Sequence, residues 1–102
     1  MPPSLSAVAF LWISREDYAR FLQICFDRSE LPATHEKWLY TTTKNIKRFE
    51  RSGTEVMRVP LDLDIFIAWC RAKGLNIDSH ARTEYANEIA AIQIRARDER
   101  KH

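Results

Sequence analysis

The sequence predicts a single small α+β domain, mainly helical, with four helices and two short strands in the order β-α-α-β-α-α. Three observations support this class. The chain has 102 residues, of which 45% are hydrophobic and 29% charged, and this composition suits one folded domain. Four segments repeat apolar residues at helical spacing. Two short segments are rich in β-branched or aromatic residues, as strands are.

The domain is expected to span residues 7–97. Residues 1–6 contain two prolines and two serines before any periodic pattern begins, so they are predicted to form a flexible tail. Residues 98–102 are all charged or histidine, and we expect this end to fray into solvent.

The first predicted strand covers residues 7–13, a short apolar run that contains Val, Phe, Trp and Ile and stops at a serine. An extended lead-in is the alternative. Ser14 is expected to cap a helix that runs to about Asp27, because Glu16 and Asp17 fall in the first turn, where the helix dipole favours negative charge. The predicted core-facing stripe of this helix comprises Tyr18, Phe21, Leu22, Cys25 and Phe26.

A loop is expected over residues 28–33, because Pro32 pushes the residue before it out of the helical region. Thr34 can then cap a second helix that runs to about Arg51 and ends at Gly53, the residue type that favours a left-handed stop. The predicted buried side of this helix comprises Trp38, Thr42, Ile46 and Phe49.

Residues 54–61 form the second predicted strand, which ends at Pro60 or lies on an edge because proline cannot donate to a ladder. Asp62 is expected to cap a third helix over residues 63–73, which Gly74 closes. The two strands pair with each other or, across a dimer axis, with their own copies.

A fourth helix is expected to begin at Asp78 or Ser79, either of which can act as its N-cap. Apolar residues at helical spacing define its predicted stripe. That stripe comprises Ala81, Tyr85, Ile89, Ile92 and Ala96.

The third predicted helix is apolar on two sides, which points to self-association. One face carries the apolar residues Leu63, Phe66, Ile67 and Cys70. The nearly opposite face carries Ile65, Trp69 and Ala72. A helix that is apolar all round is buried or lies in an interface. We therefore predict a homodimer interface at this second face, with coverage by the strands as the alternative.

The second predicted helix carries a basic stripe on the side away from Trp38. Its members project within about 100° of one another. They are Lys37, Lys44, Lys47, Arg48 and Arg51. Such a stripe can follow a phosphate backbone, since each cation that neutralises a phosphate releases counterions. The alternative is an ordinary solvated face, on which Glu36 and Glu50 reduce the repulsion between the cations.

No catalytic motif, cofactor-binding motif or metal site is predicted. Two glycines do not supply a phosphate-binding loop. His35-Glu36 begins a zinc-helix pattern, but Leu39 stands where the second histidine belongs. Cys25, Cys70 and the histidines lack the short spacings of zinc ligands. Asp62 and Asp64 are explained by helix capping and the helix dipole.

The chain is expected in the cytoplasm and not in a membrane. Its longest apolar run, residues 7–13, is far shorter than the roughly 20 residues that span a bilayer. This run is also a poor signal peptide, because the first cation, Arg15, follows it. Two cysteines make no disulfide framework, which favours a reducing compartment.

The segment from residue 54 to 96 resembles the ribbon-helix-helix family of DNA-binding proteins. The resemblance lies in EVMRVP, a helix of about a dozen residues, Gly74, and LNIDSHARTEYANEI, in which a serine begins the second helix. It implies a dimer in which two strands form an antiparallel ribbon in the major groove. Val56 and Arg58 would then face bases, Met57 and Val59 the core, and Asp78 and Ser79 a phosphate.

The first functional hypothesis is a small cytoplasmic, non-catalytic binding or assembly module without a cofactor, which self-associates and has protein partners. The missing catalytic motifs and the two-faced third helix support it. The alternative is a dimeric ribbon-helix-helix-like transcriptional regulator that binds duplex DNA.

Overall fold

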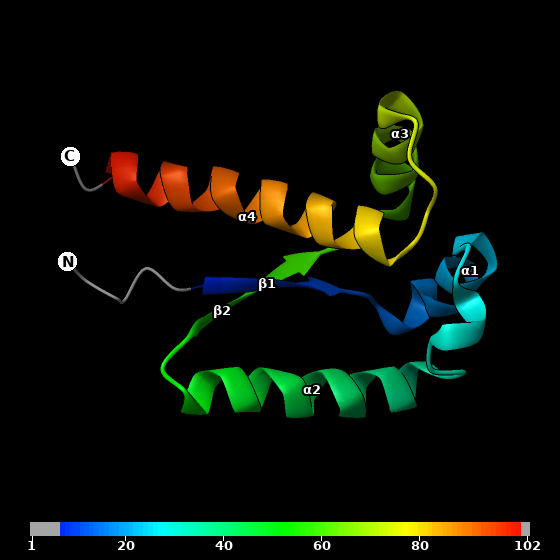
Figure 1. Cartoon of the computed structure of the whole chain (residues 1–102), viewed down its shortest axis with the longest axis horizontal. Helices are drawn as coiled ribbons and strands as arrows, with labels where there is room; N and C mark the ends of the chain where they lie inside the picture. Colours follow the sequence, from blue (N-terminus) through cyan, green and yellow to red (C-terminus); the bar gives the residue numbers. More distant parts are fainter. Residues whose placement is uncertain (1–6, 101–102) are drawn as a thin grey trace.

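The computed structural model describes residues 7–100 and contains the predicted elements in the predicted order (Figure 1). The bounds of the strands and α-helices are β1 Ala7–Trp12, α1 Arg15–Ile24, α2 His35–Arg51, β2 Glu55–Pro60, α3 Leu63–Lys73 and α4 Ser79–Arg100. A single 3-10 turn, η2 Arg28–Glu30, lies in the segment expected to be a loop. The predicted tail over residues 1–6 lies outside the described residues.

The two strands pair with each other in parallel, from Ala7 opposite Glu55 to Trp12 opposite Pro60. The sequence allowed the strands to pair with each other or with their copies in a dimer, and the structure contains the pairing within one chain. Parallel neighbours need a long crossover connection, and α1 and α2 supply it. Figure 1 shows α2 on one side of the sheet and α4 on the other, with α1 and α3 at one end.

Helix α2 covers one face of the sheet through aromatic contacts. Phe10 meets Phe49 with ring centroids 5.9 Å apart, and Trp12 meets Trp38 at 5.3 Å. Residues directly opposite each other in a parallel pair point to the same face. Arg58, which lies opposite Phe10, therefore shares the α2 side of the sheet.

The main core lies where α1, α3 and the first turns of α2 and α4 meet at the end of the sheet. Phe21, Phe66 and Cys70 are almost fully buried there. Phe66 contacts Tyr85 of α4 edge to face at 5.1 Å, and Tyr18 contacts Trp38 of α2 at 6.1 Å. These contacts join all four helices around one apolar cluster.

Side-chain caps begin the helices where the sequence predicts them. Ser14, Thr34 and Asp62 each accept a hydrogen bond from the backbone N–H three residues on, at 3.1 to 3.2 Å. Of the two candidates for α4, Asp78 is the cap, because its carboxylate accepts from the Ala81 N–H at 3.0 Å. Gly74 ends α3 with φ 68°, in the left-handed region that glycine adopts at little cost.

The predicted end of α1 at Asp27 is wrong, because the helix ends at Ile24. The Phe26 N–H donates to the Ile77 carbonyl at 2.7 Å, which draws the chain toward the α3–α4 connection. Phe26 therefore leaves the predicted core stripe and is 79% exposed. Tyr18, Phe21 and Cys25 of that stripe are buried as predicted.

The predicted stripe of α4 is also wrong in its second half. Ala81 and Tyr85 are buried, but Ile92 and Ala96 are exposed. The buried side turns to Ala86 and Ala90, because the later turns of α4 pack on β1 and no longer on the helices. Small alanines allow this close approach between helix and strand.

One further helix boundary and the burial of one residue on α2 differ from expectation. The helix α4 continues to Arg100, so residues 98–100, which were expected to fray, are helical. On α2, Trp38, Thr42 and Ile46 are buried as predicted, whereas Phe49, which was predicted on the buried side, is 37% exposed. Phe49 lies about one turn beyond Ile46, the last buried residue of α2, and its ring contacts that of Phe10 on β1.

Candidate functional site

The outward side of α3 is apolar and largely uncovered within the described residues. We call it the α3 outer face; it consists of Ile65, Ala68, Trp69 and Ala72. Ile65 is 58% exposed, the two alanines are exposed, and Trp69 is half-buried. The opposite side, with Leu63, Phe66 and Cys70, packs into the core. The strands do not cover the outer face, since they pack between α2 and α4. Ala68 also belongs to this face, and the sequence-based prediction did not name it, although at about 100° per residue it falls within about 60° of both Ile65 and Ala72.

Trp69 links the α3 outer face to α4. Its indole N–H donates to Glu88 Oε2 at 2.9 Å, and its ring meets Tyr85 edge to face at 5.3 Å. The Lys73 ammonium lies 5.1 Å from the ring centroid and 3.4 Å from Glu88 Oε1. The bond from Trp69 lowers the pKa of Glu88, with a smaller contribution from Lys73. The tryptophan is therefore held in one orientation at the border of the exposed patch.

Charges of both signs border the α3 outer face. Lys73 and Glu88 form an exposed ion pair beside Trp69, and Arg20 pairs with Asp64 next to Ile65. These two ion pairs supply charges of both signs beside the α3 outer face.

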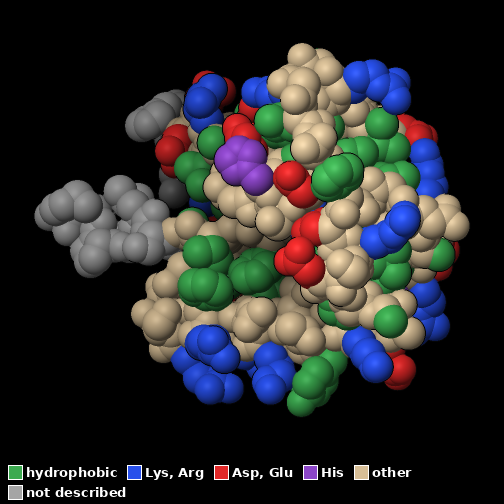
Figure 2. All heavy atoms as spheres, turned by 45° about the vertical axis from the view of Figure 1, so that its right-hand side comes forward, with side chains coloured by type: hydrophobic (Ala, Val, Ile, Leu, Met, Phe, Trp, Pro, Cys, Tyr) green, Lys and Arg blue, Asp and Glu red, His purple; other side chains and the backbone are tan. Residues whose placement is uncertain are grey.

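The basic stripe of α2 is a second exposed surface. All five of its cations are exposed, and none of them takes part in an ion pair among residues 7–99. We call Lys37, Lys44, Lys47, Arg48 and Arg51 the α2 basic face. Figure 2 shows Lys and Arg side chains gathered along the lower side of the molecule, where α2 lies in Figure 1.

Tyr40 lies within the α2 basic face, and the sequence-based prediction of the stripe did not include it. It is 66% exposed, and the Lys44 ammonium lies 5.3 Å from its ring centroid. At about 100° per residue, Tyr40 falls inside the arc that the five cations occupy, which is the signal that would have identified it.

The residues that the ribbon resemblance assigns to DNA do not join the α2 basic face. Val56 is half-buried, and exposed Arg58 lies over the Trp12 ring, 5.2 Å from its centroid. Ser79 is exposed in the first turn of α4. Helix α2 covers the face of the sheet that Arg58 shares, and the α2 basic face points away from the sheet.

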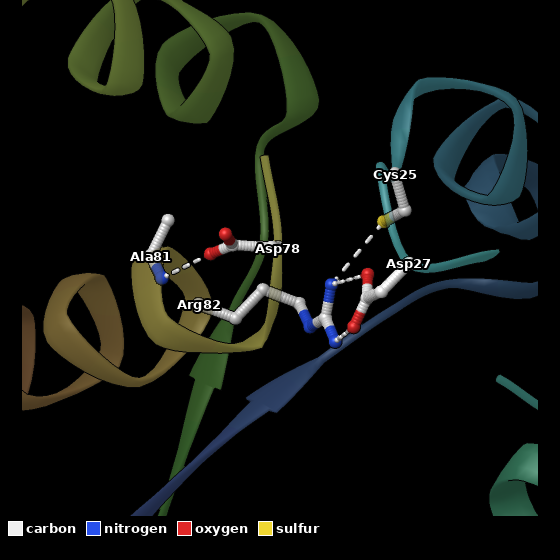
Figure 3. Close-up of polar contacts among 5 residues, drawn as sticks. All are labelled: Cys25, Asp27, Asp78, Ala81 and Arg82. Carbon is white, nitrogen blue, oxygen red and sulfur yellow. Dashed lines mark hydrogen bonds and ion pairs between the residues drawn. The ribbon is translucent and has the colours of Figure 1, made fainter. Parts of the chain in front are cut away.

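A polar cluster ties α4 to the chain after α1 (Figure 3). The Arg82 guanidinium donates to both carboxylate oxygens of Asp27, at 2.9 and 2.7 Å, and to Cys25 Sγ at 3.4 Å. Burial raises the pKa of the Cys25 thiol to about 11, although Arg82 acts in the opposite direction. The hydrogen bonds from Arg82 lower the pKa of Asp27. At neutral pH the cluster therefore contains an ion pair and a neutral thiol.

A pocket of about 270 Å³ lies beside this cluster, lined mainly by apolar side chains of β1, α1 and α2. Ser79, Arg82 and Thr83 contribute its polar wall. Because Asp27 already neutralises Arg82, the pocket offers no uncompensated charge to a ligand. The arrangement fits a structural ion pair between two elements.

In residues 7–100, no three His, Cys, Asp or Glu side chains lie close enough together to hold a metal ion. Over the same residues, no helix has the length and apolar character needed to cross a membrane. Cys25 and Cys70 are both free and buried, and Asp62 acts as the cap of α3.

Comparison with protein-family models, curated proteins and solved structures found no match to this chain.

Proposed function

We propose that this protein is a small, non-catalytic cytoplasmic binding module that self-associates through the α3 outer face. The observation that supports the proposal best is the exposure of Ile65 on a helix whose opposite side is buried in the core. Apolar side chains gathered on one exposed face mark interaction sites. An aromatic residue at the border, here Trp69, is a frequent energetic anchor in such interfaces.

A second copy of the same chain fits this face better than a partner of one charge. A two-fold interface brings the same patch of both subunits together, so each charge must find its opposite on an identical surface. The border of the α3 outer face supplies both signs, as Lys73 with Glu88 and Arg20 with Asp64. In a dimer, Lys73 of one copy can approach Glu88 of the other without leaving a charge unpaired.

The proposal of a non-catalytic role rests on how the reactive side chains are used. The thiol of Cys25 is neutral at neutral pH, and the thiolate is the nucleophilic form. Arg82 and Asp27 neutralise each other. Two free, buried cysteines are also in keeping with a reducing cytoplasm.

The test is the molar mass in solution, measured by light scattering and sedimentation over a wide range of concentration. The wild type should form a dimer. Ile65→Glu should remain folded, because the side chain is exposed in the single chain, but it should be monomeric because a dimer would bury an unpaired charge. Trp69→Glu should also be monomeric, and it additionally loses the contacts of the indole ring with Tyr85 and Glu88.

Tyr40→Glu is the matched control, since it adds the same charge at an exposed side chain of α2, away from the α3 outer face. This variant should dimerise as the wild type does. A wild type that stays monomeric at the highest concentration reached would refute the proposal. So would an Ile65→Glu variant that dimerises with unchanged affinity.

A further inference from the structure

We propose that the α2 basic face together with Tyr40 binds single-stranded nucleic acid, with the cations on phosphates and the tyrosine ring stacked on a base. This inference concerns a different surface from the proposed dimer interface and does not depend on it. It rests on three features of α2: cations without acidic partners, an exposed aromatic ring among them, and an apolar side that is already used by the core.

The cations of the α2 basic face are available to a ligand. None of the five pairs with an acidic side chain among residues 7–99, whereas four other Lys or Arg side chains of the same region do. Glu36 and Glu50 are exposed on the same helix but form no ion pair with them. From Lys37 to Arg51 the face is about 21 Å long, at the helical rise of about 1.5 Å per residue. A row of cations of this length can follow several successive phosphates.

Tyr40 gives this surface a feature that a plain basic patch lacks. The residue is 66% exposed, and the Lys44 ammonium lies 5.3 Å from the ring centroid. A ring that has a cation near it and solvent around it can accept a base by stacking. Tyr40 also lines a surface depression together with Pro32, Glu36, Lys37 and Thr41, so hydrogen-bonding groups, including one carboxylate, lie next to the place where a base would stack.

An exposed ring among cations favours a single strand over a duplex. Base faces are open to aromatic side chains in single strands, whereas in a duplex they are stacked on one another. An anionic membrane is a poorer fit, because an interfacial helix inserts its apolar side into the lipid. On α2 that side, with Trp38 and Ile46, is buried in the protein.

The experiment is a fluorescence-anisotropy titration of the wild-type protein with labelled oligothymidylate and oligouridylate of about 20 nucleotides. A duplex of the same length and vesicles with an anionic lipid are the comparison ligands. If five phosphates are contacted, single-strand affinity should fall roughly a hundredfold between about 50 and about 200 mM salt. Both single strands should bind more tightly than the duplex and the vesicles.

Three variants separate stacking from charge. Tyr40→Ala should weaken single-strand binding by roughly 5- to 150-fold, the range for one stacked base, and Tyr40→Phe should restore it because the ring is kept. Lys47→Gln with Arg48→Gln should flatten the salt dependence to roughly twentyfold over the same interval. The matched control, Arg71→Gln with Arg95→Gln, removes two exposed cations outside α2 and should leave the salt dependence unchanged.

The proposal is overturned if the wild type does not bind either single strand at the lower salt concentration. It is also overturned if Tyr40→Ala binds as the wild type does, or if duplex or vesicles bind at least as tightly as single strands. All of these variants lie at exposed positions, so circular dichroism should show unchanged folding. Dimerisation is read from molar mass, so failure of this proposal is distinguishable from failure of the proposed dimer.

Discussion

Arg82 binds Asp27 through two hydrogen bonds, at 2.9 and 2.7 Å, and so fixes the first turn of α4 to the chain that follows α1. Both side chains are largely buried, with 14% and 16% of their surface exposed. Charges withdrawn from water are tolerated only as pairs. The pair therefore holds together two segments that the sequence separates by more than fifty residues.

Removal of this pair should destabilise the fold. Arg82→Met leaves the Asp27 carboxylate without its partner, and the expected loss is about 3 kcal/mol, at the lower end for buried pairs because some water contact remains. Urea unfolding measures the loss. Arg97→Met, which breaks the exposed pair of Arg97 with Glu55, is the control and should cost much less. Equal losses in the two variants would contradict the structural role of Arg82.

The pair of Arg82 and Asp27 also predicts how the stability of the fold depends on pH in the acidic range. Because Arg82 lowers the pKa of Asp27 in the folded state, the pair stabilises the fold above the unfolded pKa of about 4. This contribution is lost as the pH falls through the folded-state pKa. The free energy of unfolding of the wild type should therefore decline below about pH 4, and Asp27→Asn should show a smaller decline. An identical decline in both proteins would exclude Asp27 as the titrating group.

Both cysteines should be slow to react in the native protein. Burial raises the pKa of Cys25 to about 11 and that of Cys70 above its ordinary value, so thiolate is scarce at neutral pH and the sulfur atoms are covered. The rate of modification by a thiol reagent should rise sharply when urea unfolds the chain. Elemental analysis should find no stoichiometric zinc. Rapid modification of the folded protein, or one equivalent of zinc, would show that this assignment is wrong.

Burial of Cys25 also predicts that the fold loses stability at alkaline pH. A thiol whose folded-state pKa is raised stabilises the fold below its unfolded pKa of about 9, and this stability is lost as the pH rises toward about 11. The free energy of unfolding should fall over this interval. Cys25→Ala should remove part of that decline, and a variant that keeps the full decline would point to another group.

Trp38 and Lys47 lie on opposite sides of α2 and should differ strongly in their effect on stability. Trp38 is buried against Trp12 and Tyr18, so Trp38→Ala should cost about 3 to 5 kcal/mol. Lys47 is exposed, and Lys47→Ala should change the free energy of unfolding by less than about 0.5 kcal/mol. Denaturant unfolding measures both. Comparable losses would mean that the orientation of α2 is different.

The element order and the helix starts were predictable from the sequence because their causes are local. A side chain such as Ser14 or Asp62 bonds a backbone N–H three residues away, and Gly74 needs only its own dihedral angles to end a helix. Periodic apolar residues also placed the core sides of α2 and α3 correctly, since each of these helices packs mainly on one side.

The candidate site was predictable only in part. The basic stripe of α2 and the second face of α3 follow from helical spacing, and both are exposed as separate surfaces. Tyr40 was not predicted because the basic stripe was defined by its cations alone, whereas Ala68 follows from the same helical spacing that identified Ile65 and Ala72. The position of Arg58 on the α2 side of the sheet could not be predicted either, because it depends on the register between β1 and β2.

By itself, the sequence determined the fold class, the caps and the core-facing sides of α2 and α3, since these depend on residues within one or two turns of each other. The tertiary structure decided where α1 ends, how β1 and β2 pair and which side of α4 is buried. Each of these depends on a contact between distant segments, such as the Phe26 N–H with the Ile77 carbonyl or Ala86 with the sheet. Such contacts leave no local periodic signal, because the free energy that favours them arises only when the elements have packed together.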